Sequence, residues 1–254
     1  MEYVEFLRVR RTLLWYSGIL ALIVLVILTL PQVGTINVHG AGSSTRFAPG
    51  AGAPLSALAT LAGFFAAIYA TIVGASLNRE SETRDLSWTK PLSRTLLAVR
   101  YMLLDLAGVL VAFSVALGGA AIVATYMHFP PVFDPQAGTQ LVLAFGVGAM
   151  WYGLLQALTC AFRSGARAMN GILWPVALAI GGLSHLPGPL GAVLRLVDLI
   201  NPLHYLGMTT SDGPMSAEQT LGYPMPADER ALIVWCLALG FCAIAVYVWP
   251  RREA

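Results

Sequence analysis

The chain has 254 residues, of which 57% are hydrophobic and only 11% are charged. Soluble domains carry about 25% charged residues, so this composition excludes an ordinary soluble protein and indicates a membrane protein with several spans. The formal net charge of +2 gives no reason to expect a nucleic-acid partner. We expect the whole chain, 1–254, to form a single transmembrane domain.

The first stretch, 1–11, is amphipathic, because its apolar residues alternate with Glu5, Arg8, Arg10 and Arg11. This pattern predicts a helix that lies along the inner membrane surface with its basic side chains toward anionic head groups. The apolar run that follows is too long for a cleaved signal peptide, and no A-x-A site comes after it. We therefore expect an uncleaved first span.

Apolar runs long enough, or nearly long enough, to cross about 30 Å of hydrocarbon occur repeatedly along the chain. Lys and Arg are retained in cytoplasmic loops, and a cytoplasmic location for both termini places twelve of the 15 basic residues inside. The sequence thus predicts an all-α protein with six transmembrane helices, both termini cytoplasmic, in the cell (cytoplasmic or inner) membrane. The predicted spans are 13–30, 55–77, 96–127, 140–162, 168–183 and 231–249.

The most charged stretch, 78–94, connects the second and third predicted spans. Such a loop must lie in water, and its basic residues assign it to the cytoplasm. One interpretation is a solvated loop whose charges only set the topology, but its acidic residues contribute nothing to orientation. Pro91 is expected to end a surface helix, and Ser93, just before Arg94, to cap the next one.

A second unusual segment, 186–206, lies between the fifth and sixth predicted spans. Its first half has apolar residues at helical spacing, but it is too short for another span and predicts a re-entrant or interfacial helix. Arg195 and Asp198 are three positions apart and are expected to pair. Pro202 and His204 follow them.

The sequence contains no motif for ATP binding or catalysis: G-x-x-x-x-G-K-[ST], HExxH and GxSxG are all missing. The histidines and cysteines show neither metal-ligand spacing nor a disulfide pattern. We therefore expect no metal, no cofactor and no enzymatic activity in this chain, and interpret these residues as polar loop histidines and buried thiols, although a heme or metal role for the histidines is conceivable. They are His39, His128, His185, His204, Cys160, Cys236 and Cys242.

Asp105 is the one acidic residue inside a long apolar run. Charge is costly in a membrane, so two roles are open for Asp105. Either its carboxylate pairs with Arg100 or with a group on a neighbouring span, or it contacts a transported proton or substrate. Small residues spaced four apart in the second span permit close helix contact. They serve either packing within the chain or an interface with a second chain, and they are Gly63, Ala67, Ala70 and Gly74.

The topology, the basic N-terminus, the charged loop and the interrupted outer segment together resemble the ABC-2 type permeases, the membrane subunits of ATP-binding-cassette exporters. In that family the loop begins with a charged, Glu-rich stretch and ends in Pro-x-Ser-Arg. Here it contains Glu80-Ser-Glu82 and ends in Pro91-Leu-Ser93-Arg94. The resemblance in topology covers nearly the whole chain, whereas the motif covers only about fifteen residues. Arg84-Asp85-Leu86 stands where the family often has Gly-Thr/Leu.

The resemblance implies that the loop forms a coupling helix that docks in a groove of an ATPase subunit. Glu80 and Glu82, with Arg84, would meet charged groups there, while Leu86 and Trp88 would fill an apolar notch. The implied partners are two ATPase subunits, which hold ATP and Mg²⁺, and a second permease chain, identical or homologous. Spans one, two and five would line that dimer interface, and segment 186–206 would correspond to the family's re-entrant helices.

Three other functions fit a polytopic membrane protein. A secondary transporter or channel would use Asp105 and work without an ATPase. An intramembrane enzyme acting on lipids would need a nucleophile or a metal cluster, and neither is evident. A scaffold would carry out no transport. The apolar lining leaves the class of substrate open.

Overall fold

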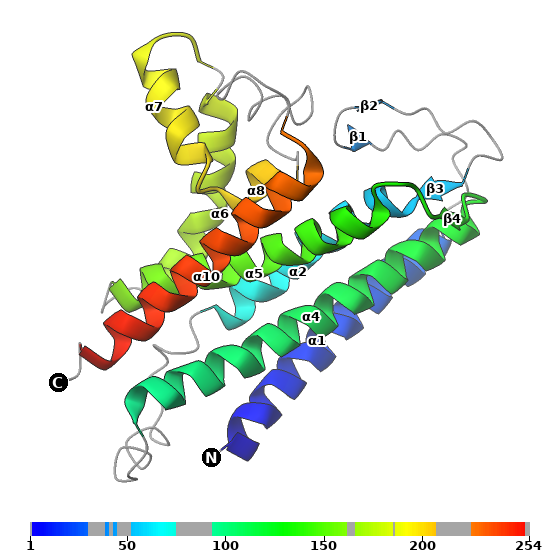
Figure 1. Cartoon of the computed structure of the whole chain (residues 1–254). Coiled ribbons are helices and arrows are strands. Elements are labelled where there is room, and N and C mark those ends of the chain that lie inside the picture. Colours follow the sequence, from blue (N-terminus) through cyan, green and yellow to red (C-terminus); the bar gives the residue numbers. More distant parts are fainter. Residues whose placement is uncertain are drawn as a thin grey trace.

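The computed structural model describes residues 2–29, 39–40, 43–44, 52–74, 93–161, 166–184, 186–206 and 225–251. This part of the chain is almost entirely helical, and Figure 1 shows long helices that run roughly along one direction. Within it, five helices are long and apolar enough to cross a membrane. The chain is therefore an all-α membrane protein, as the composition predicts, and its described connections contain four two-residue strands.

Helix α1 extends without a break over Glu2–Thr29, where the sequence predicts a surface helix at 1–11 and a separate span at 13–30. No Gly or Pro precedes Gly18, so nothing in the chain interrupts the helix. The basic side chains that were expected to meet head groups point in two directions. Arg8 turns toward the protein, with 17% of its side chain exposed, whereas Arg10 and Arg11 remain exposed.

The remaining long helices start and stop within a few residues of the predicted spans. They are α2 (Leu55–Val73), α4 (Arg94–Tyr126), α5 (Ala137–Ala161) and α10 (Ala227–Arg251). Helix α5 lies at the centre, between α2 and α10, while α1 lies along α4 (Figure 1). The largest fully buried side chains include Trp151 and Tyr152 of α5 and Tyr69 of α2.

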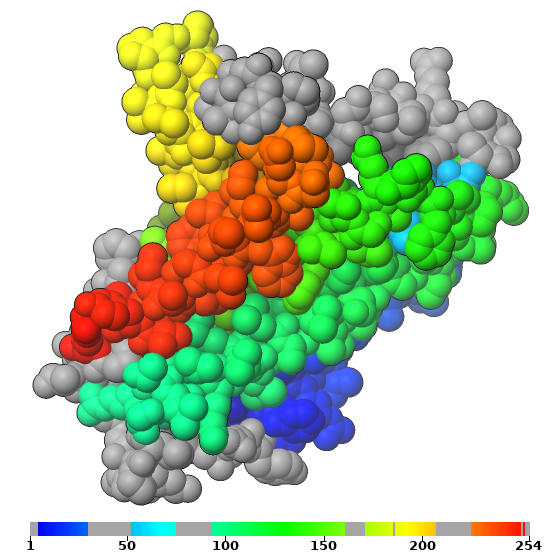
Figure 2. Space-filling model, in the orientation of Figure 1, coloured from blue at the N-terminus to red at the C-terminus, as the bar shows by residue number. Residues whose placement is uncertain are grey.

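Helix α6 (Ala166–Leu183) covers the fifth predicted span. It is shorter than the other long helices, contains Pro175, and is not among the five span-length apolar helices of the described residues. It leads to α7 (Pro189–Asp198) and the one-turn helix α8 (Pro202–Tyr205). Figure 2 shows α7, in yellow, projecting from the body of the molecule. In Figure 1 the two chain ends lie at the same end of the bundle, and α7 lies at the other.

Short strands lie in the connections at the end of the bundle away from the two chain ends (Figure 1). Strands β1 (His39–Gly40) and β2 (Ser43–Ser44) pair antiparallel. Strand β3 (Ala53–Pro54), just before α2, pairs in parallel with β4 (Pro131–Val132), just before α5. Asp134 then accepts a hydrogen bond from the backbone N–H of Ser56 at 3.1 Å, which satisfies one of the open N–H groups in the first turn of α2.

The small residues of α2 pack inside this chain. Ala67 and Ala70 are fully buried, and a Cβ atom on Gly63 would lie 2.8 Å from the carbonyl oxygen of Ala144 in α5. A Cβ atom on Gly74 would lie 2.8 Å from Cβ of Leu155, also in α5. All four positions are buried within this chain, and Gly63 and Gly74 let α2 approach α5, so of the two interpretations packing within the chain accounts for them.

We expect Gly63→Val to destabilise the protein by about 1–3 kcal/mol, because the added side chain overpacks the contact between α2 and α5. Gly118→Val is the matched control, since a Cβ atom on Gly118 would meet no atom within 4 Å. The check is unfolding of both variants by SDS in mixed micelles. Equal stability of Gly63→Val and Gly118→Val would contradict the packing argument.

Candidate functional site

The most polar place inside the helix bundle is an ion pair between α1 and α4. Arg8 donates from Nη2 to Oδ1 of Asp105 at 2.6 Å. On its other side, Asp105 accepts a hydrogen bond from the Tyr152 hydroxyl of α5 at 3.0 Å. The Asp105 side chain is 0% exposed, so a carboxylate in this position depends on the guanidinium and the phenol for its stabilisation.

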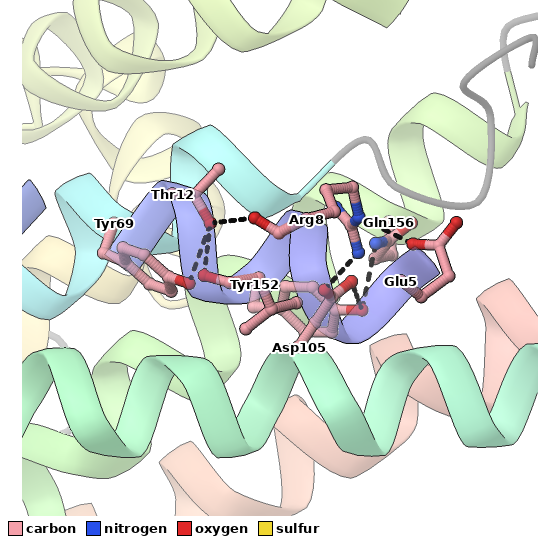
Figure 3. A network of polar contacts seen from close by, with 8 residues as sticks. Glu5, Arg8, Thr12, Tyr69, Asp105, Tyr152 and Gln156 are labelled. Carbon is pink, nitrogen blue, oxygen red and sulfur yellow. Dashed lines mark hydrogen bonds and ion pairs between the residues drawn. The ribbon is translucent and has the colours of Figure 1, made fainter. Parts of the chain in front are cut away.

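The ion pair extends into a network across four helices, drawn in Figure 3. Arg8 also donates from Nε to Oε2 of Glu5 at 2.6 Å. Gln156 donates from Nε2 to the Tyr152 hydroxyl at 3.0 Å. One turn further along α1, the hydroxyls of Thr12 and Tyr69 lie 3.3 Å apart, which brings α2 into the network.

Helical periodicity explains why these side chains meet. On α1, Glu5, Arg8 and Thr12 are spaced three and four apart, so they share one face. Tyr152 and Gln156 of α5 are likewise four apart. Arg100, the partner considered within α4, is five positions from Asp105, about 140° away around the helix. Arg100 is accordingly exposed and Asp105 buried, and the neighbouring helix α1 provides the pairing that the sequence left open.

A second buried polar cluster lies where α7, α8 and α6 meet. His204 Nδ1 lies 2.7 Å from Oδ2 of Asp198. Asn201 donates from Nδ2 to Oδ1 of Asp198 at 2.8 Å, and also to the carbonyl oxygen of Ala177 in α6 at 2.9 Å. Through Asn201, the turn between α7 and α8 is therefore fastened to the middle of α6.

This cluster corrects two expectations. Asp198 pairs with His204 and not with Arg195, because Asp198 points inward while Arg195 is half-buried on another side of α7. His204 is buried, not an exposed loop histidine. Pro202 is buried as well and begins α8, whose N-cap is Asn201. The Asn201-Pro202 pair indicates a helix start just before His204. The sequence does not show that His204 lies next to Asp198.

Tyr205 completes the α8 turn. Its hydroxyl donates to the carbonyl oxygen of Leu199 at 2.8 Å. Burial, with a smaller contribution from the Asp198 charge, raises the pKa of Tyr205 to about 12. The phenol therefore stays protonated in neutral solution and keeps its role as a donor.

A third polar contact joins α2, α5 and α6. Thr71 accepts hydrogen bonds from the indole N–H groups of Trp151 and Trp174, both at 2.8 Å. The two indole rings lie with their centroids 4.5 Å apart. Phe64 packs edge-on against Trp174 with 5.5 Å between ring centroids. One threonine hydroxyl thus attaches α6 to the rest of the bundle.

The expected docking loop lies mostly outside the described residues, which include neither Glu80, Glu82, Arg84, Leu86, Trp88 nor Pro91. Its end is described. The Ser93 side chain accepts a hydrogen bond from the backbone N–H of Leu96 at 3.2 Å, which confirms the expected cap, and Arg94 is the first, exposed residue of α4. Among the described residues, no three His, Cys, Asp or Glu side chains lie close enough to hold a metal ion.

Comparison of the chain with protein-family models, with curated proteins and with solved structures gives no match.

Proposed function

We propose that the chain is the membrane-spanning permease subunit of an ATP-binding-cassette exporter, which forms a substrate pathway with a second permease chain and is driven by separate ATPase subunits. The observation that carries this proposal is the charged loop 78–94 between two apolar helices, with Glu80-Ser-Glu82 near its start and Pro91-Leu-Ser93-Arg94 at its end. The Ser93 cap supports a helix start directly after this loop.

Six crossings with both termini in the cytoplasm are part of the proposal. What supports them is the course of α6 in Figure 1, which leads away from the end of α5 and toward the end of the bundle where α7 lies. Helix α6 is held along its length by Trp174 and by the Asn201 contact at Ala177. With α6 as a crossing, the loop 78–94 and both termini lie on one side, the side with most of the Lys and Arg.

A re-entrant or interfacial position for α7 is also proposed. Its buried positions are Gly191 and Asp198, while its large apolar side chains point away from the protein. An apolar face that is turned outward on a helix too short to span suits contact with lipid at the membrane boundary. The exposed apolar residues are Leu190, Val193, Leu196 and Val197 of α7, and Ile200 just after it.

The alternative of a transporter or channel that uses Asp105 receives no support from the geometry. A carboxylate that exchanges protons or binds substrate needs access, and Asp105 is fully buried with the Arg8 guanidinium 2.6 Å away. Polar side chains that bond across helices contribute to helix association in a membrane. We therefore assign Asp105 a structural role.

The test reverses the two acidic residues of the loop. Candidate ATPase subunits, encoded by neighbouring genes, are co-expressed with the tagged chain. In Glu80→Lys with Glu82→Lys we expect about a tenfold or greater loss of the co-purified ATPase, because removing one partner of a buried interfacial charge pair costs more than the 1.4 kcal/mol that corresponds to tenfold.

The matched control is Asp228→Lys with Glu229→Lys, which reverses two neighbouring acids in the first turn of α10. This control is expected to retain the ATPase. If the Glu80 and Glu82 variant retains the ATPase at the normal level, the docking role is contradicted. If the unaltered chain binds none of the candidate ATPases, the proposed function is contradicted.

A further inference from the structure

Helix α1 is held to the rest of the molecule by little apolar surface. It packs mainly on α4 and to a lesser extent on α2, and Figure 2 shows it, in blue, along the side of α4. Among its described side chains, the buried apolar ones are Val9, Tyr16 and Leu20. Most of its other large apolar side chains face outward, so apolar packing alone does not fix the position of α1.

Its polar contacts to other helices are concentrated at one end. In the described part of the chain these are the Arg8–Asp105 ion pair at 2.6 Å and the Thr12–Tyr69 contact at 3.3 Å. The Tyr16 ring then packs edge-on against Tyr69 at 5.2 Å between centroids. Beyond Tyr16 only Leu20 is buried, so α1 is fastened near its N-terminus and loosely packed further on.

The inner face of α1 also leaves polar atoms unmatched. Arg8 Nη1 and the Tyr16 hydroxyl are buried and have no hydrogen-bond partner among the described residues. Buried polar groups are normally satisfied by protein groups or ordered water. The Arg8–Asp105 ion pair at 2.6 Å is thus the firm polar contact of this seam.

Asp105 is well placed to transmit movement. It lies eleven positions after Arg94, the first residue of α4, so about 16 Å of continuous helix separates it from the end of the loop 78–94, at 1.5 Å per residue. Tyr152 and Arg8 hold the Asp105 side chain from two directions. A displacement of the N-terminal end of α4 thus reaches α1 through a rigid element and one short ion pair.

We propose that the Arg8–Asp105 ion pair is a mechanical tie that makes α1 follow α4 when the cytoplasmic end of α4 moves. Arg8 and Asp105 are positioning residues in this inference. The source of the movement rests on the proposed function, in which an ATPase pulls on the loop before α4. The tie itself depends only on the contacts between α1 and α4.

The test measures distances between spin labels by pulsed electron paramagnetic resonance on the full chain in lipid nanodiscs, after replacement of its native cysteines. One label pair joins α1 to α4 at Leu14 and Leu103, and a second joins α1 to α10 at Leu14 and Leu239; all three side chains are exposed, and Leu14 lies in the fastened part of α1. In the unaltered background we expect one narrow distribution for the pair between α1 and α4.

Arg8→Gln and Asp105→Asn are each expected to broaden that distribution. The double variant should be no broader than either single one, because residues that act through one contact give non-additive effects. Arg10→Gln is the matched control: Arg10 is an exposed arginine on the same helix, and its loss should leave the distribution narrow. A narrow distribution in both single variants, or additive broadening, would overturn the tie.

A second arm uses unaltered Arg8 and Asp105, so it does not depend on the folding of the variants. With the ATPase bound and trapped by ATP and vanadate, we expect a changed distance between α1 and α10 at a constant distance between α1 and α4. A change between α1 and α4 under these conditions contradicts the inference. If no ATPase binds, the proposed function fails, and the first arm still decides whether the tie exists.

Discussion

Asp105→Ala is expected to lower the free energy of unfolding by about 3 kcal/mol, because removal of one partner from a buried ion pair leaves the other charge uncompensated. The affected charge is the Arg8 guanidinium, and the Tyr152 hydroxyl loses its acceptor as well. Arg8 keeps its contact with Glu5 at 2.6 Å, so the effect belongs at the lower end of the range of about 3–5 kcal/mol for such pairs.

SDS-induced unfolding in mixed micelles, followed by tryptophan fluorescence, measures this effect. Asp228→Ala is the control, since Asp228 is an exposed aspartate in the first turn of α10, and surface substitutions usually change stability by less than about 0.5 kcal/mol. A loss below 1 kcal/mol in Asp105→Ala would mean that the ion pair contributes no more than an exposed one.

The long helices could be predicted from the sequence because span length is dictated by the bilayer. Helix α2 begins at Leu55, as expected, and α4 begins at Arg94 behind the Ser93 cap. In these regions a local pattern of apolar residues, a capping residue or a proline is sufficient to set a helix end. The same reasoning placed a short helix in the first half of 186–206, where α7 covers Pro189–Asp198.

The partners of buried polar groups could not be predicted in the same way. Arg8 and Asp105 are 97 positions apart, and the pairing depends on how α1 lies against α4. The charged face of 1–11 favoured a surface helix because sequence periodicity does not distinguish head groups from a carboxylate on a neighbouring helix. Similarly, Asp198 pairs with His204 and not with Arg195, because the turn into α8 brings His204 back toward the protein.

The small residues of α2 illustrate a further limit of sequence reasoning. Spacing of four indicates that a helix permits close approach but does not identify the approaching helix. Gly63 and Gly74 face α5 of the same chain. If a second permease chain is present, its contact surface must therefore be made by other residues. The outward apolar sides of α1, α6 and α7 remain available for lipid or for such a chain.

Thr71→Val is expected to destabilise the protein by about 2–4 kcal/mol, because it removes the acceptor of two indole N–H groups and each buried donor left unsatisfied costs about 1–3 kcal/mol. Valine keeps the shape of threonine, so the change isolates the hydroxyl. The Trp151 ring is fully buried and Trp174 partly so, and neither indole can turn to water without disturbing the stack between them.

Loss of the Thr71 hydroxyl should loosen α6 more than any other helix, since the Trp174–Thr71 hydrogen bond is a polar attachment of α6 to α2. Thr125→Val provides the comparison: the Thr125 hydroxyl bonds only a carbonyl oxygen of its own helix, Ala121, and is exposed. Cysteine accessibility along α6, measured with a membrane-impermeant maleimide at Leu173 and Ala177, which face the bundle, should rise in Thr71→Val and stay constant in Thr125→Val. Equal labelling in the two variants would show that α6 is held by its apolar contacts and not by the threonine.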